Sequence, residues 1–124
     1  MAKNILVVDD EKSYVKAFVR LFTRAGYDVV TAVTGVDAMN KAHEHRPDLV
    51  ILDVNMPGGG GGDVYDLLSM SSQTSDTPVF FISGTDFEDL RSDFSFIKRA
   101  QFFSKPIDEA LLLERVRHLF SSGI

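Results

Sequence analysis

Five short apolar segments, separated by turn signals or amphipathic stretches, constrain the fold of this chain more than any other feature. In the clearest one, residues 49–52, an apolar run with two β-branched side chains stops at Asp53. A run of this length between turn signals is typical of a strand buried on both faces of a sheet. The sequence therefore predicts strands at residues 4–8, 28–32, 49–52, 79–82 and 101–104.

Stretches with helical spacing lie between the predicted strands. Tyr14, Phe18 and Phe22 recur at every fourth position, and Gly26 is typical of the residue that ends a helix. Further helices are expected near residues 36–42, 63–70, 87–97 and 112–120.

The alternation of strands and helices indicates the α/β class. Such a pattern requires a parallel sheet that is covered on both faces. Right-handed crossovers limit the topology to the doubly wound kind. We expect a flavodoxin-like (βα)5 fold with strand order 2-1-3-4-5, in a single domain that spans residues 1–124.

Charge and composition exclude several functional classes. The chain has 124 residues, a net charge of −5 and no cysteine. The acidic balance argues against a nucleic-acid or anionic-membrane surface, and the lack of cysteine excludes disulfides and thiolate nucleophiles. No stretch approaches the roughly 20 apolar residues that span a bilayer, and no signal-peptide core opens the chain. We therefore expect a cytoplasmic protein with no direct nucleic-acid or membrane partner.

Polar side chains stand at the C-terminal ends of four predicted strands. These are Asp9 and Asp10, Asp53, Ser83 and Lys105. Because the first and third strands are expected to be neighbours, the three carboxylates should converge. Two such charges ~4 Å apart repel by ~1 kcal/mol in water and ~4 kcal/mol at an effective dielectric constant of about 20. A hard cation such as Mg²⁺ would balance them, and the whole set suits phosphoryl transfer.

Four segments of the chain resemble the receiver domain of two-component response regulators, the CheY-like family. They are VVDDE at 7–11, ILDVNMPG at 51–58, ISG at 82–84 and FFSKP at 102–106. Their order and spacing match the family across nearly the whole chain. The resemblance implies a signalling switch, with at most intrinsic autophosphorylation and autodephosphorylation.

The resemblance also implies an acceptor residue and a metal site. Asp53 would be the phosphoacceptor for a sensor histidine kinase, a phosphotransfer protein or a small phosphodonor. Mg²⁺ would be bound by Asp10, by Asp53 and by the backbone carbonyl of Asn55, with Asp9 acting through water.

The other family positions concern the response to phosphorylation. Lys105 would pair with the phosphoryl oxygens and Ser83 would hydrogen-bond them. The Lys105–Pro106 peptide is expected to be cis. Phe102 would be the switch aromatic that changes rotamer as Ser83 moves.

The output face would be formed by the helix expected near 87–97, the strand at 101–104 and the last helix. A downstream partner or an output domain would bind there, and a homodimer is another outcome that the resemblance allows. The chain ends soon after the last helix, which fits either a stand-alone regulator or part of a larger protein.

Each of these residues also has a plain structural alternative. Asp10 could cap the first helix, and Asp53 could only shape a turn. Ser83 could likewise cap a helix, Lys105 could be solvated, and Phe102 could be a core aromatic.

The glycines at 58–62 depart from the family pattern. Because interior glycines cost roughly 0.5–1 kcal/mol each relative to alanine, a mobile loop and a late helix start near Asp63 are expected. The run is not a phosphate-binding P-loop, because Gly62 is followed by Asp63 and not by Lys-Ser/Thr.

Three other functions remain open from the residues. A haloacid-dehalogenase-like phosphatase shares the aspartate nucleophile, but Asn55 stands where its second aspartate is expected. A flavodoxin-like electron carrier would need a phosphate loop where the acidic segment 9–11 stands. A receiver-shaped interaction module that is never phosphorylated is the third.

Overall fold

Five parallel strands form one sheet in the described part of the chain, in the order β2-β1-β3-β4-β5. The computed structural model describes residues 2–55, 61–84 and 101–122. The strands are β1 (Asn4–Val8), β2 (Asp28–Ala32), β3 (Leu49–Asp53), β4 (Val79–Ser83) and β5 (Gln101–Ser104). This order confirms the flavodoxin-like prediction, and all five predicted strands lie where the apolar segments placed them.

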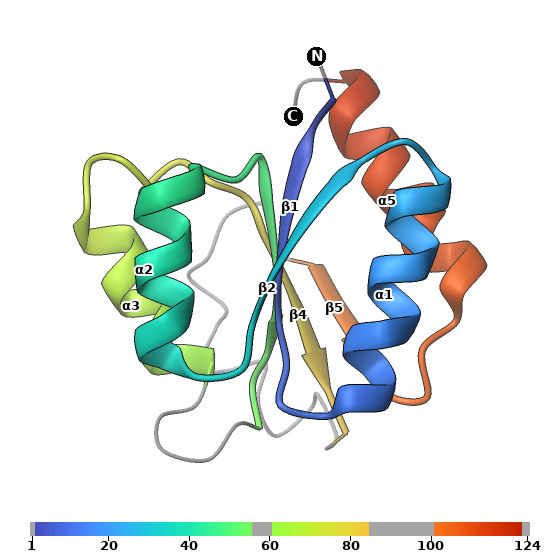
Figure 1. Cartoon of the computed structure of the whole chain (residues 1–124), viewed down its shortest axis with the longest axis horizontal. Coiled ribbons are helices and arrows are strands. Elements are labelled where there is room, and N and C mark those ends of the chain that lie inside the picture. The colour runs from blue at the N-terminus through green and yellow to red at the C-terminus, as the bar shows by residue number, and fades with distance from the viewer. Residues whose placement is uncertain (1, 56–60, 85–100, 123–124) are drawn as a thin grey trace.

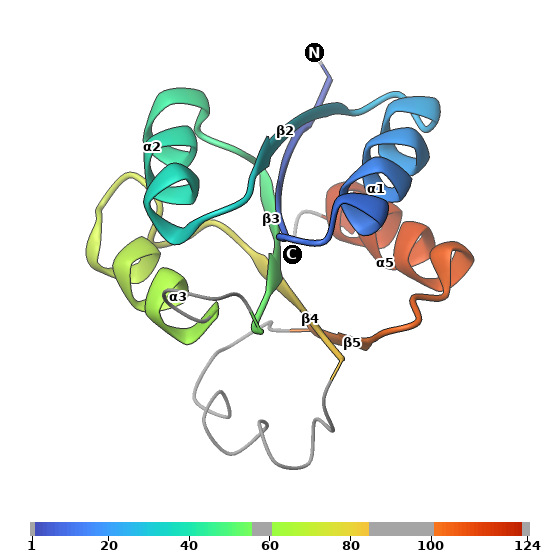
Figure 2. The same ribbon diagram turned by 60° about the horizontal axis from the view of Figure 1, so that its bottom comes forward.

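Helices cover both faces of the sheet, as Figures 1 and 2 show. The helices are α1 (Lys12–Arg24), α2 (Gly35–His45), α3 (Gly61–Met70) and α5 (Glu109–Ser122). The first and last of them lie on one face, and α2 and α3 lie on the other. The helix expected near residues 87–97 falls outside the described residues. Within those residues, no helix has the length and apolar character that a membrane span requires.

The alternation of side chains along the strands builds two separate cores. Ile5 and Val7 point to a core that includes Phe18 and Phe22 of α1. Their neighbours on β1 point to the other face, where the core includes Val64 of α3. Every residue of β3 and of β4 is buried. These two central strands therefore hold their C-terminal ends in fixed positions.

The helix boundaries agree with the sequence in one place and differ in another. Gly26 has φ +95° two residues after the end of α1, a left-handed conformation that favours glycine, as its predicted role requires. The late start of α3 was wrong, because the helix begins at Gly61, two residues before Asp63. Val64 and Leu68 bury the inner face of α3, and such packing outweighs weak local propensity. The glycines at 58–60 lie outside the described residues.

Candidate functional site

Strand register brings the predicted site residues to one edge of the sheet. Val8 pairs with Leu52, so Asp9 and Asp53 come next on neighbouring strands. Ser83 pairs with Ser104, so Lys105 follows at the same level. The backbone N–H of Lys105 donates to the Ser83 carbonyl at 2.8 Å, and the N–H of Asp9 donates to the Ala32 carbonyl at 3.2 Å. These bonds continue the hydrogen bonding of the sheet beyond the strands, so they fix the backbone positions of Asp9 and Lys105.

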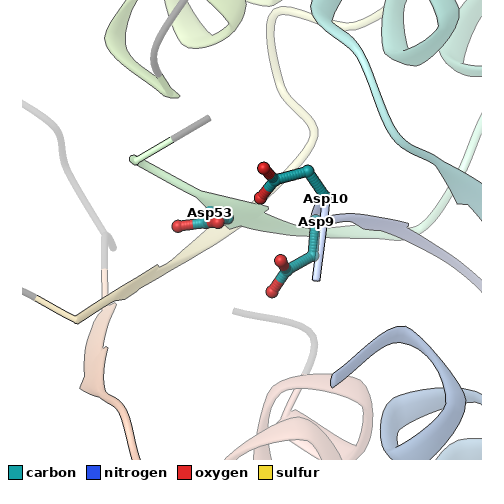
Figure 3. Close-up of side chains that lie close together, drawn as sticks. All are labelled: Asp9, Asp10 and Asp53. Atoms are coloured by element: carbon teal, nitrogen blue, oxygen red, sulfur yellow. The ribbon is translucent and has the colours of Figure 1, made fainter. Parts of the chain in front are cut away.

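Three carboxylates meet at this edge, as predicted. One oxygen from each of Asp9, Asp10 and Asp53 lies within 4.8 Å of the others. Figure 3 shows them at the neighbouring ends of β1 and β3. Asp9 and Asp53 are buried, whereas Asp10 is exposed. The N-cap residue of α1 is Glu11, so Asp10 does not take the capping role that was its structural alternative.

Backbone N–H groups orient both buried carboxylates. Oδ1 of Asp9 accepts a hydrogen bond from the N–H of Glu11 at 2.9 Å. Oδ1 of Asp53 accepts one from the N–H of Asn55 at 3.0 Å. Each aspartate therefore shapes a turn with the residue two positions on. In both side chains it is Oδ1 that the backbone N–H holds.

Asp9 Oδ2 forms an ion pair with Lys105 at 3.3 Å, but this contact is not a hydrogen bond. This oxygen is buried and accepts no hydrogen bond within the described ranges. Burial raises the pKa of Asp9 to about 6; the Glu11 N–H opposes this rise, the charge of Asp53 adds to it and Lys105 opposes it. A buried carboxylate oxygen of this kind is satisfied best by a cation. The donor set consists of carboxylate oxygens, so it fits a hard divalent ion such as Mg²⁺.

Lys105 lies in the centre of this acidic group. Its Nζ is 2.7 Å from Oε1 of Glu11, 3.3 Å from Oδ2 of Asp9 and 3.6 Å from Oδ2 of Asp53. The ammonium group also lies 4.5 Å from the centre of the Tyr14 ring, a cation–π distance. Burial lowers the pKa of Lys105, but the hydrogen bond to Glu11 and the two aspartate charges outweigh burial and raise it. Lys105 is therefore a fixed positive charge and not a solvated lysine.

Ser83 lies at the end of β4, and Phe102 of β5 packs against the core on the α2–α3 face of the sheet. The buried Ser83 hydroxyl donates to Oδ1 of Asn55 at 2.7 Å. Phe102 is half-buried and stacks on Phe81, with ring centres 5.4 Å apart and planes at 18°. The Lys105–Pro106 peptide bond is cis, as predicted.

Sequence reasoning missed two contacts of this site. Glu11 appeared only as part of an acidic segment, although it makes the shortest contact of Lys105. Tyr14 was placed in a helical stripe, and its position next to Lys105 was not foreseen. The spacing of Glu11 two residues after Asp9 was the available signal, because a turn at Asp9 brings the two side chains to the same edge.

Comparisons with known proteins show the family of this chain. The family model described as the response regulator receiver domain matches residues 5–117. The chain is 36% identical over 119 residues to the response regulator PleD of Caulobacter vibrioides, a match that covers 96% of this chain and 26% of PleD. It is 29% identical over 120 residues to the polar-differentiation response regulator DivK of Brucella anthropi, covering 94% of this chain and 95% of DivK.

A solved structure extends the likeness to three dimensions. The chemotaxis protein CheY4 of Vibrio cholerae superposes with a TM-score of 0.88 at 28% identity, over 95% of this chain and 98% of CheY4. This chain spans only about a quarter of PleD, so the likeness to PleD concerns one segment of that protein.

Proposed function

This chain belongs to the response regulator receiver domains, the signalling switches of two-component phosphorelays, and we propose that Asp53 is its phosphoacceptor. One observation carries the proposal. Oδ2 of Asp53 lies 3.6 Å from the Lys105 ammonium group, beside the other two carboxylates. A nucleophilic oxygen next to a fixed positive charge and a cation-binding group is what in-line phosphoryl transfer uses.

The step transfers one phosphoryl group. Oδ2 of Asp53 attacks phosphorus while the bond from phosphorus to the leaving group breaks. The leaving group is the imidazole of a phosphohistidine, which takes up a proton from water as the P–N bond breaks, or acetate when acetyl phosphate is the donor. Hydrolysis of the acyl phosphate by water would release inorganic phosphate and restore the Asp53 carboxylate.

Mg²⁺ would be held by Asp10, Asp53 and the backbone carbonyl of Asn55, with Asp9 acting through water. When bound, this ion would neutralise charge on the phosphoryl oxygens. Asp9 would hold the ion's water in place, and its buried Oδ2, which accepts no hydrogen bond from the described residues, supports this role.

Lys105 and Ser83 would recognise the transferred group. Lys105 pairs with a phosphoryl oxygen through its ammonium group, and Ser83 donates its hydroxyl to another. Ser83 must leave the 2.7 Å bond to Asn55 to do so. Phe102 would then change rotamer, because it packs on Phe81 of β4, the strand that ends in Ser83.

The expected partners follow from the family. A sensor histidine kinase or a phosphotransfer protein would supply the phosphoryl group. A downstream protein or an output domain would bind the face that includes β5 and α5, with a homodimer as one form of this contact. Residues 1–124 would act as one receiver domain, in the cytoplasm.

The phosphatase alternative is not favoured. It needs a general acid two residues after the nucleophile, and here Asn55 stands at that position, where its side-chain oxygen accepts a hydrogen bond from the Ser83 hydroxyl. A carboxamide does not act as a general acid at neutral pH.

Intact mass spectrometry tests the proposal directly. The chain is incubated with acetyl phosphate and Mg²⁺, and a mass gain of one phosphoryl group is expected. Asp53→Asn should show no gain, while Asp28→Asn on β2 serves as a matched aspartate control. The same gain in Asp53→Asn would refute the assignment.

A further inference from the structure

The Lys105 ammonium group makes its shortest contact with Glu11 and not with Asp53. We infer that Glu11 is a positioning residue that holds Lys105 in the unphosphorylated state and competes with the phosphoryl group for it. This inference rests on the proposed function of Asp53. It adds a residue outside the phosphoacceptor, the metal ligands and the residues that recognise the phosphoryl group.

The donor capacity of Lys105 is the first part of the argument. An ammonium group has three N–H donors, and three carboxylates lie within ion-pair distance of Nζ. Among the described residues, Nζ donates a hydrogen bond to Glu11 at 2.7 Å, whereas Asp9 and Asp53 lie at the ion-pair distances of 3.3 and 3.6 Å. A phosphoryl oxygen that takes this donor from Lys105 must therefore compete with Glu11. Glu11 therefore already holds Lys105 before the chain is phosphorylated.

Burial decides which carboxylate yields. The Asp9 and Asp53 side chains are 1% and 2% exposed, whereas the Glu11 side chain is 53% exposed. The two aspartates are also anchored by backbone N–H groups through their Oδ1 atoms. Glu11 loses least when it releases Lys105, because its carboxylate can be hydrated at once. It is the contact that a phosphoryl group would displace.

The Glu11 side chain does not cap α1, so a substitution at Glu11 tests its contact with Lys105. It occupies the N-cap position of α1 but makes no capping hydrogen bond. The bond that orients Asp9 comes from the backbone N–H of Glu11, which any residue except proline retains. A change at the Glu11 carboxylate therefore leaves the orientation of Asp9 intact.

The negative charge of Glu11 should slow phosphorylation, as its contact with Lys105 does. Phosphodonors are anionic, and Glu11 adds a fourth carboxylate to the three that form the candidate metal site. Removing the Glu11 charge should free Lys105 and reduce the repulsion of the incoming donor. Both effects should speed phosphorylation, whereas loss of a merely structural side chain would slow it.

The test compares Glu11→Gln with Glu114→Gln, a charge-matched change on α5. Acetyl phosphate labelling is followed by intact mass at saturating Mg²⁺. Since exposed ion pairs are typically weak, Glu11→Gln should label about two- to fivefold faster than the wild type. It should bind beryllofluoride, which stands in for the phosphoryl group, more tightly by a similar factor. Glu114→Gln should match the wild type in both measurements.

The outcomes separate this inference from the proposed function. Labelling of Glu11→Gln at or below the wild-type rate, with the wild type labelled normally, would overturn the role of Glu11 alone. A wild-type chain that takes up no label would overturn the proposed function and the competition with it. Thermal unfolding of both variants checks that each is folded under the assay conditions.

Discussion

Ser83 and Asn55 lie 28 residues apart, yet the hydroxyl of one donates a 2.7 Å hydrogen bond to the side-chain oxygen of the other. The bond joins the end of β4 to the loop that follows β3. It also ties a residue expected to contact the phosphoryl group to a residue two positions after Asp53. Its strength is accessible to measurement without any phosphorylation.

A double-mutant cycle should detect this bond. Asn55→Ala, Ser83→Ala and the double variant are compared by urea unfolding. A hydrogen bond donated by a buried hydroxyl should give a coupling energy of about 0.5–1.5 kcal/mol. Strictly additive effects on the free energy of unfolding would contradict the prediction. The same cycle measured with beryllofluoride should show weaker coupling, because Ser83 is then expected to turn to the ligand.

Loss of Asp10 should remove most of the affinity for Mg²⁺. Substitution of an outer-shell partner typically costs about 10–100-fold in metal affinity, so Asp10→Ala as a direct ligand should cost at least about tenfold. Isothermal titration calorimetry measures the dissociation constant, with Asp28→Ala as the matched change on β2. Unchanged Mg²⁺ affinity in Asp10→Ala would refute its role as a ligand.

Loss of the Lys105 charge should raise the affinity for Mg²⁺, whereas loss of Asp10 lowers it. Lys105→Met removes a cation within 3.3 Å of Asp9 and 3.6 Å of Asp53, so the carboxylates should bind Mg²⁺ about three- to tenfold more tightly. The conformational response to beryllofluoride should be lost, as read from NMR shifts of β5 and α5. Lys41→Met, on α2, is the control. Weaker Mg²⁺ binding by Lys105→Met would count against this arrangement of charges.

The raised pKa of Asp9 predicts a dependence of stability on pH. The pKa is about 6 in the fold against 3.8 for an ordinary aspartate, so the neutral carboxyl is the form that the fold prefers. Its stabilising contribution is complete below pH 3.8 and is lost as the pH rises through 6. At 1.36 kcal/mol per pKa unit, the loss is up to about 3 kcal/mol.

Asp9→Asn isolates this effect from the other carboxylates. Urea unfolding between pH 4 and pH 8 should show the wild type losing stability relative to Asp9→Asn as the pH rises through about 6. Parallel curves for the two proteins would show that Asp9 titrates normally. Saturating Mg²⁺ should restore the wild type at neutral pH, because the ion takes the place of the proton.

The fold could be predicted almost completely because its strands are short apolar runs with sharp ends. Residues 49–52 locate β3, and Asp53 marks its end within one residue. The parallel order then places Asp9, Asp53 and Lys105 at one edge without any further information. The start of α3 could not be predicted, because packing of Val64 and Leu68 against the sheet decided it.

Pairings between side chains were the part that the sequence could not supply. The partner of Lys105 depends on the turn at Asp9, which brings Glu11 to the ammonium group. The partner of Ser83 depends on how the loop after β3 orients Asn55. Both choices follow from backbone geometry at the ends of strands, where propensity and hydrophobic pattern carry no signal.

The two turns at Asp9 and Asp53 order these carboxylates when the chain folds, so their side-chain entropy is not lost when a ligand binds. In each turn a backbone N–H holds Oδ1, so the carboxylate has lost its rotational freedom before a ligand arrives. A cation or phosphodonor therefore meets acceptors that are already ordered, and little of its binding energy is spent on ordering them. The site is therefore preorganised at Asp9 and Asp53 before any ligand binds.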